Sequence, residues 1–268
     1  MKNGKRLLAL LLCLAALAVL AGCGKAEAPQ PADRLAAIQQ RGSIIIATEG
    51  DWVPWTYHDE ADALVGFDVE IGERIAAELG VKAEFAETDW DSILAGVDSG
   101  RFDIACNGVD LTAARAEKYA FSDPYIYPDA VLVVRADNED IHTLEDLAGR
   151  TTANSPSSTY ADMALEYGAE VTYVSTLTDT VQMLEQGRVE ATINAQGSIR
   201  EYMDQHPDAN IKVVELIEGD PVAFPMQKNE DAASLVEAVN AALEKMRADG
   251  TLGELSVKYF GVDLTEKN

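Results

Sequence analysis

The chain has 268 residues, of which 46 are acidic and 21 basic, and its formal net charge is −25. This length suffices for one large or two medium domains, each with its own buried core. The negative charge argues against nucleic acid or anionic lipid as a partner, because both carry charge of the same sign. The acids are scattered rather than run together, which is typical of a solvated surface.

The first 22 residues have the pattern of a secretory signal peptide. Basic residues precede the apolar run Leu7–Leu20, which is too short to span a membrane comfortably. Cys23 follows Leu-Ala-Gly, and this sequence resembles the lipobox of bacterial lipoproteins, in which the cysteine is acylated after cleavage. We therefore expect a lipid-anchored, extracytoplasmic protein with residues 23–41 as a flexible tether. A plain signal peptide followed by an incidental cysteine is the alternative.

Cleavage would change both the charge and the cysteine content. The leader carries three positive charges and no acids, so its loss takes the net charge from −25 to −28 and leaves 246 residues. Cys13 would leave with the leader and Cys23 would carry lipid, so only Cys106 would remain. No intramolecular disulfide could then form, and Cys106 is expected to be a small buried residue of a strand.

Beyond the tether, apolar strands alternate with amphipathic helices, which predicts an α/β fold. In the first set, Asp68 is expected to cap a helix that Gly80 ends, and Asp89 or Asp91 to cap the next helix, which Gly100 ends. The strands of this set are expected at 44–47, 82–86 and 102–106.

The second set repeats the alternation. Thr143–Asp146 has the pattern of a capping box, and helices are expected to begin near Ser157 or Ser158 and near Thr178 or Asp179. Strands are expected at 151–154, 171–174, 189–193 and 211–216, and further helices at 198–205, 232–248 and 252–259.

Two segments in these sets share one pattern. Gly100–Asn107 and Gly187–Asn194 each have Gly-Arg, an apolar residue, an acid, and Asn seven residues after the Gly. Because ligands of open α/β sheets bind at the carboxyl ends of strands, the repeat predicts two lobes whose strand tips face a shared cleft. Helix–glycine–strand units are common in α/β proteins, and this is the simpler interpretation. The extended runs 130–135 and 220–226 are expected to be the two hinge strands.

The segment Gly100–Tyr125 carries the most specific polar chemistry of the chain. Its strand ends in Asn-Gly, and a helix is expected to start at Thr112, so unpaired main-chain N–H groups gather there. Arg115, in the first turn of that helix, is a two-pronged donor suited to a carboxylate. The combination predicts a site for the acid group of a small molecule. A surface ion pair of Arg115 with Glu117 or Asp110 is the alternative.

Several segments together resemble the bacterial solute-binding proteins of polar amino-acid ABC transporters, from about Gly42 onward. These segments are Gly66–Leu79, Asp89–Ser92, Phe121–Tyr125, Leu144–Gly149 and Asp249–Leu252. The resemblance implies a type II periplasmic-binding-protein fold, in which 42–131 and 226–268 form the first lobe and 132–225 the second. It also implies a monomer that binds an amino acid without a cofactor or metal and delivers it to an ABC permease in the membrane.

The resemblance further implies roles for individual residues. Arg115 would bind the ligand α-carboxylate, helped by main-chain groups of Gly108 and Asp110. Further donors would come from the helix start in the second lobe, at Ser157, Ser158 and Thr159, although a simple helix cap is the alternative there. Trp52 and Trp90 would place rings above and below the ligand, or else belong to the core as Trp55 does. Glu49 lies near the position that selects the ligand side chain.

The chain departs from the family at two positions. Asn194 stands where the family usually has the Asp that pairs with the ligand ammonium, and Asp110 stands where it usually has Ser or Thr. A buried ammonium needs a negative partner, because its desolvation costs several kcal/mol. We therefore hypothesise that Asp110, helped by Glu49, binds the ammonium.

The expected function is capture of a polar amino acid. The segments Thr48–Gly50 and Tyr259–Thr265 look like those of cystine-binding members, so cystine is the favoured ligand and a cationic amino acid the alternative. An enzyme resembling cyclohexadienyl dehydratases, with Glu49 or Asp110 as general acid, is the second hypothesis. A surface lipoprotein that acts as a sensor or adhesin is the third. No catalytic constellation is evident, so we expect no enzyme activity.

Overall fold

The computed structural model describes residues 31–267, and the part from Asp33 onward forms one compact unit. The predicted signal peptide (1–22) and the predicted lipidation site Cys23 lie outside the described residues. Among the residues described, no helix is long and apolar enough to cross a membrane. Cys106 is a free, buried cysteine.

The predicted tether is not extended over its whole length. Residues Arg34–Arg41, within the expected 23–41 tether, form helix α2, which Asp33 caps by accepting a hydrogen bond from Ala36 N. Arg34 and Arg41 both pair with the buried carboxylate of Asp103. These ion pairs and the burial of Ile38 fix the helix on the folded domain.

The first sheet has five strands, and β1 runs parallel to its neighbours β5 and β6. Its order is β5 (Lys82–Glu87), β1 (Ser43–Thr48), β6 (Ile104–Ala105), β13 (Pro225–Gln227) and β7 (Tyr119–Phe121). The accompanying helices are α2, α3 (Phe67–Glu78), α4 (Trp90–Asp98), α5 (Ala113–Lys118), α9 (Ala233–Ala248) and α10 (Thr251–Phe260). A small three-stranded sheet comprises β2 (Asp51–Trp52), β3 (Thr56–His58) and β4 (Leu64–Val65). We call this assembly the first lobe.

The second sheet also has five strands. Its order is β10 (Glu170–Tyr173), β9 (Thr151–Asn154), β11 (Ala191–Ala195), β8 (Ala130–Arg135) and β12 (Ile211–Ile217). The helical segments are η1 (Leu144–Leu147), α6 (Thr159–Glu166), α7 (Leu177–Glu185) and α8 (Gln196–Gln205). Two apolar clusters contain alternate residues of β8, one with Leu132 and the other with Val133, so this strand is buried on both faces. We call this assembly the second lobe.

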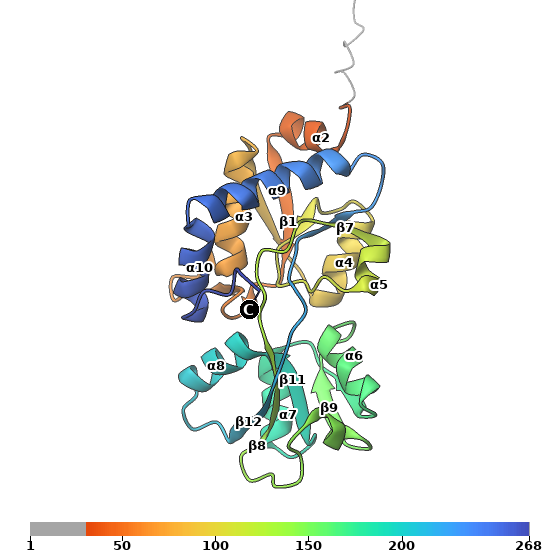
Figure 1. Cartoon of the computed structure of the whole chain (residues 1–268), viewed down its shortest axis with the longest axis vertical. Coiled ribbons are helices and arrows are strands. Elements are labelled where there is room, and N and C mark those ends of the chain that lie inside the picture. Colours follow the sequence, from red (N-terminus) through yellow and green to blue (C-terminus); the bar gives the residue numbers. More distant parts are fainter. Residues whose placement is uncertain (1–30, 268) are drawn as a thin grey trace, which may run out of the picture. The chain divides into compact units, whose positions relative to one another are not determined.

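The chain crosses between the lobes twice, in segments 122–129 and 218–224, which run side by side in Figure 1. Tyr125 N donates to Val222 O and Val222 N donates to Ile126 O, each at 3.0 Å. The segment 130–135, expected as a hinge strand, is instead β8, an interior strand of the second sheet. Its five consecutive apolar residues are buried by pairing with β11 and β12, which an exposed linker would not allow.

The predicted α/β architecture is confirmed, with two mixed sheets and helices around them. Helix α3 differs from expectation because its cap is Gly66, and Asp68 lies fully buried inside the first turn. The Asp68 carboxyl accepts hydrogen bonds from Gly108 N and Tyr125 Oη, both at 2.7 Å. Helix α7 is capped by Thr176, two residues before the expected start. The capping box at Thr143 is confirmed.

The two segments with the shared pattern occupy equivalent places in the two lobes. The acid of each binds a main-chain N–H of the neighbouring strand: Asp103 accepts from Ile45 N at 2.7 Å, and Glu190 from Thr151 N at 3.1 Å. Each acid also pairs with an arginine, Asp103 with Arg34 and Glu190 with Arg150, both at 2.8 Å. The same local unit therefore positions β6 and β11, whose carboxyl ends point to one region of the molecule.

Candidate functional site

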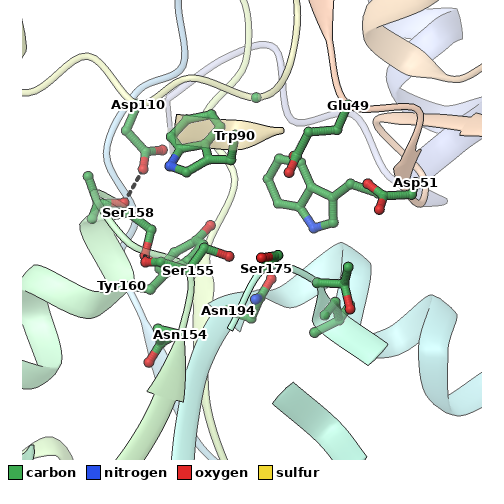
Figure 2. Close-up of a pocket in the computed structure, with 15 residues that line it drawn as sticks. Glu49, Asp51, Trp90, Asp110, Asn154, Ser155, Ser158, Tyr160, Ser175 and Asn194 are labelled. Carbon is green, nitrogen blue, oxygen red and sulfur yellow. Dashed lines mark hydrogen bonds between the residues drawn. The ribbon is translucent and has the colours of Figure 1, made fainter. Parts of the chain in front are cut away.

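A pocket lies where the carboxyl ends of strands from both lobes meet (Figure 2). Its cavity volume, taken as the space open to the centres of water-sized spheres, is about 60 Å³. The lining residues are Glu49, Asp51, Trp52, Trp90, Gly108, Asp110, Asn154, Ser155, Ser158, Thr159, Tyr160, Ser175, Thr176, Leu177 and Asn194. Most of them follow or end strands β1, β5, β6, β9, β10 and β11, which is the position expected for a ligand site in an α/β protein. Asp51 and Trp52 form β2, and the rest begin helices α6 and α7.

Eight of the ten predicted ligand-binding residues line this pocket. They are Glu49, Trp52, Trp90, Gly108, Asp110, Ser158, Thr159 and Asn194. The other two, Arg115 and Ser157, lie beside the pocket and are not part of its lining. Within residues 31–267, no group of three or more His, Cys, Asp or Glu side chains is arranged to hold a metal ion.

Asp110 connects the two lobes at one end of the pocket. The Thr159 hydroxyl, from the second lobe, donates a hydrogen bond to Asp110 Oδ2 (Figure 2). Burial raises the pKa of Asp110 from its ordinary value to about 6, against the lowering effects of Thr159 and the Arg115 charge. The carboxyl is therefore mostly ionised at neutral pH and can accept an ammonium.

Arg115 lies next to Asp110 and is held there by two main-chain carbonyl groups. Its Nη1 donates to Asp110 O and its Nη2 to Ser157 O, both at 3.1 Å, and its guanidinium lies 5.4 Å from the Trp90 ring centre. These two bonds use two of the five N–H groups of the guanidinium. The side chain is 11% exposed. Arg115 thus links the lobes through the Ser157 carbonyl while keeping donors for an anion, and the Ser157 side chain is not needed for this contact.

The start of helix α6 supplies donors to the same end of the pocket. Ser158 caps the helix, since its Oγ accepts from Ala161 N at 3.1 Å and donates to Ser155 O at 2.8 Å. The cap interpretation of Ser158 is therefore confirmed. The groups left for an anion are the main-chain N–H groups of the first helical turn, together with the positive end of the helix dipole.

Aromatic rings close the first-lobe side of the pocket. Trp52 stacks on Trp55 with ring centres 5.4 Å apart, and Trp55 is a buried core residue as expected. Gly108 has φ +56°, and a Cβ there would lie 2.8 Å from the Trp52 ring. A glycine is therefore required for the strand tip to pass under the tryptophan. Trp90 forms another part of the wall, between Asp110 and Glu49 in Figure 2.

The opposite end of the pocket is acidic. Glu49 and Asp51 come from the first lobe, and Ser175 faces them from the second (Figure 2). Thr176, the next residue, lines the same end of the pocket. Burial raises the pKa of Glu49 to about 7, and the charge of Asp51 adds to the effect. Thr176 caps helix α7 by accepting a hydrogen bond from Asp179 N at 3.1 Å. Two carboxyl groups therefore face a second helix start.

Seven lining residues were not predicted: Asp51, Asn154, Ser155, Tyr160, Ser175, Thr176 and Leu177. Ser175 and Thr176 follow a predicted strand and begin a helix, the same signal that led to Ser158. They could therefore have been found from the sequence. Tyr160 carried no such signal, because its place on helix α6 becomes a pocket wall only when the lobes meet.

Comparison with known proteins identifies the class. Residues 44–262 match the bacterial extracellular solute-binding proteins, family 3, and the chain belongs to this family. A probable amino-acid ABC transporter-binding protein of Haemophilus influenzae is 38% identical over 242 residues, which cover 90% of this chain and 92% of that protein. The L-cystine-binding protein TcyA of Bacillus subtilis is 37% identical over 269 residues, covering 98% and 100%.

The comparison with solved structures also finds amino-acid-binding proteins. An ancestral arginine-binding protein bound to arginine superimposes with a TM-score of 0.76 at 34% identity, covering 82% of this chain and 99% of that one. The predicted type II periplasmic-binding-protein fold is therefore confirmed. The relatives named here are transporter binding proteins, which confirms the prediction of a binding protein over a dehydratase-like enzyme.

Proposed function

We propose that this protein captures cystine outside the cytoplasm and delivers it to an ABC importer, held near the membrane by lipid on Cys23. The observation that carries the choice of ligand is that each end of the pocket pairs acidic side chains with a helix start. Cystine has an ammonium and a carboxylate at each of its ends, so its chemistry matches this arrangement.

At the first end, Asp110 would accept one ammonium. The remaining N–H groups of Arg115 and the first turn of α6 would hold the adjoining carboxylate. At the second end, Glu49 and Asp51 would accept the other ammonium. The second carboxylate would meet the Ser175 hydroxyl and the first turn of α7.

The charge balance of the pocket supports a ligand with two cationic groups. Glu49, Asp51 and Asp110 line it, and the lining residues, all within the described part of the chain, include no Lys, Arg or His. Arg115, beside the pocket, has Nη1 3.9 Å from Asp110 Oδ2 and offsets one of these three charges. A ligand with one cationic group would leave the Glu49 carboxyl buried without a charged partner, which is costly. Arginine, which the matched ancestral protein binds, is the second candidate. It would satisfy the acids but leave the start of α7 without an anion.

Capture would be coupled to closure of the first lobe on the second about the crossings 122–129 and 218–224. Within the described part of the chain, hydrogen bonds that join the lobes are those of Thr159 with Asp110, Arg115 with Ser157 O, and Arg200 with Phe260 O. A ligand that touches both lobes shifts the population toward the closed form. The permease would then recognise that form.

The test is calorimetry of the purified protein with cystine and arginine, for the wild type and Ser175→Ala. Loss of a hydroxyl bonded to a carboxylate is expected to weaken cystine binding by about 10-fold or more while leaving arginine binding unchanged. Thr172→Ala, on exposed β10 in the same lobe, is the matched control. Tighter binding of arginine than of cystine would contradict the choice of ligand.

Lipid anchoring is tested separately in cells. Cys23→Ser is expected to abolish incorporation of labelled fatty acid and to release the protein from the membrane fraction. Labelling that persists in this variant would exclude Cys23 as the acylated residue.

A further inference from the structure

Asn107 has an unusually constrained side chain directly below the acidic end of the pocket. The residue is fully buried, at 0% exposure. Its Oδ1 accepts three hydrogen bonds: from Glu49 N at 2.9 Å, Thr56 Oγ1 at 3.1 Å and Thr48 Oγ1 at 3.2 Å. The main-chain N–H of Glu49 can only donate and an NH₂ group could not accept its hydrogen bond, so this contact fixes which side of the amide is oxygen.

The fixed amide determines the position of Glu49. Because Oδ1 is committed to the three donors, Nδ2 points at the Glu49 carboxyl and donates to Oε2 at 2.6 Å. Asn107 does not line the pocket, whereas Glu49 does and directs its carboxyl into it (Figure 2). Asn107 therefore acts on a ligand only through Glu49.

The surroundings of Glu49 would otherwise displace this carboxyl. The charged groups that act on it are Asp51 of β2, Asp89 before α4 and Asp91 of α4, and all three are acids. Their charges and burial both raise the pKa of Glu49, whereas the Asn107 bond lowers it. The amide thus opposes both the protonation of the carboxyl and its repulsion by the neighbouring acids.

We infer that Asn107 is a positioning residue that holds Glu49 ready for a second cationic group on the ligand, and so sets the preference for ligands with two cationic groups. The inference rests on the proposed function of the pocket. It does not depend on whether that ligand is cystine or arginine, because both carry a second cation that would reach Glu49.

Asn107→Asp is the decisive variant. An aspartate has nearly the same shape and can accept the same three hydrogen bonds, but it presents an acceptor where Nδ2 donates to Glu49. The three hydrogen bonds that the side chain accepts are kept, and only its contact with Glu49 changes from attraction to repulsion. Asn240→Asp is the matched control, because Asn240 also accepts a main-chain hydrogen bond through Oδ1, from Asp123 N at 2.8 Å, on an exposed surface.

The measurement is a selectivity ratio. Cystine is compared with the mixed disulfide of cysteine and 3-mercaptopropionate, which is cystine without one ammonium, and arginine is compared with the uncharged isostere citrulline. The wild type and Asn240→Asp are expected to prefer the dicationic member of a pair by about 10-fold or more near neutral pH. Asn107→Asp is expected to reduce that ratio to about 3 or less, with affinity for the deaminated or uncharged member unchanged.

The pH profile separates positioning from a structural role. This profile is measured with arginine and citrulline, because α-amino groups such as those of cystine lose their protons from about pH 8, whereas the guanidinium stays charged. Near neutral pH the two adjacent carboxyl groups of the Asn107→Asp variant share a proton, and as the pH rises Glu49 regains its charge and the ratio is expected to rise. Glu49→Gln has no carboxyl at this position, and its ratio is expected to stay low at every pH. The double variant that combines Asn107→Asp with Glu49→Gln is expected to have the same ratio as Glu49→Gln alone, because both changes act on one contact.

Three results would overturn the inference. The first is an unchanged ratio of affinities in Asn107→Asp. The second is a reduced ratio that is as independent of pH as it is in Glu49→Gln. The third is an equal loss of affinity for both ligands of a pair. If Asn107→Asp fails to fold, Asn107→Ser takes its place, since it removes the Nδ2 donor to Glu49, and an unchanged ratio there counts against the inference. Tight binding of arginine with weak binding of cystine would refute the proposed ligand, yet the arginine–citrulline ratio would still test Asn107.

Discussion

The hydrogen bond from Thr159 to Asp110 gives the sharpest prediction about closure. Its two partners belong to different lobes, so it exists only when the lobes are together. Thr159→Val replaces the hydroxyl by a methyl group of similar volume and removes the donor. The variant is therefore expected to weaken the closed form without disturbing the first lobe, where the ligand would bind first.

The magnitude follows from the type of bond. A hydrogen bond to a carboxylate contributes about 1.5–3 kcal/mol, so its loss is expected to raise the Kd by about 10–150-fold. Because the bond forms after encounter, the change is expected mainly in the dissociation rate. Stopped-flow tryptophan fluorescence with cystine gives both rate constants, and calorimetry gives the Kd.

Thr152→Val is the matched control for this experiment. Thr152 lies in the same lobe, and its buried Oγ1 has no hydrogen-bond partner, so the substitution is expected to leave affinity unchanged. A double-mutant cycle with Asp110→Asn completes the test. Additivity of the two changes within about 0.5 kcal/mol would refute the coupling between Thr159 and Asp110, as would a loss confined to the association rate.

Three further results are expected. Asp110→Asn should weaken amino-acid binding far more than Asn194→Ala, and equal effects in calorimetry would count against Asp110 as the ammonium partner. Gly108→Ala should lower affinity and melting temperature together, because its Cβ would lie 2.8 Å from the Trp52 ring at a positive φ, and wild-type behaviour would refute this requirement. Burial raises the pKa of Asp68 to about 7, so the folded state binds more protons than the unfolded state above pH 3.8. Stability to urea should therefore fall as pH rises toward 7, by up to about 1.4 kcal/mol per pH unit from this group. Asp68→Asn should flatten that slope, and an unaltered slope would contradict it.

The strand tips of the pocket could be predicted because their signals are local. Glu49 and Gly108 follow short apolar strands, and Ser158 precedes an amphipathic helix, so a fold with converging strand ends brings them together. The repeated pattern ending in Asn107 and Asn194 also indicated that both lobes use one unit. These features need no knowledge of which distant residues meet.

The remaining features depend on contacts between distant parts of the chain. Asp68 has the local pattern of a helix cap, but its partners Gly108 and Tyr125 lie 40 and 57 residues away, and they draw it into the core. The residue type of Arg115 predicts an anion-binding donor, but not that Ser157 O would take one of its N–H groups. The role of Asn107 follows from three donors that only the folded sheet brings to its oxygen.

The central claim is that both ends of the pocket hold a charged end of one ligand, with Arg115 at the carboxylate. A crystal structure of the protein with cystine tests it most directly. We expect one carboxylate on the Arg115 guanidinium and the start of α6, and the second ammonium on Glu49. An Arg115 side chain turned into bulk water, or a ligand that leaves the Glu49 end empty, would contradict it.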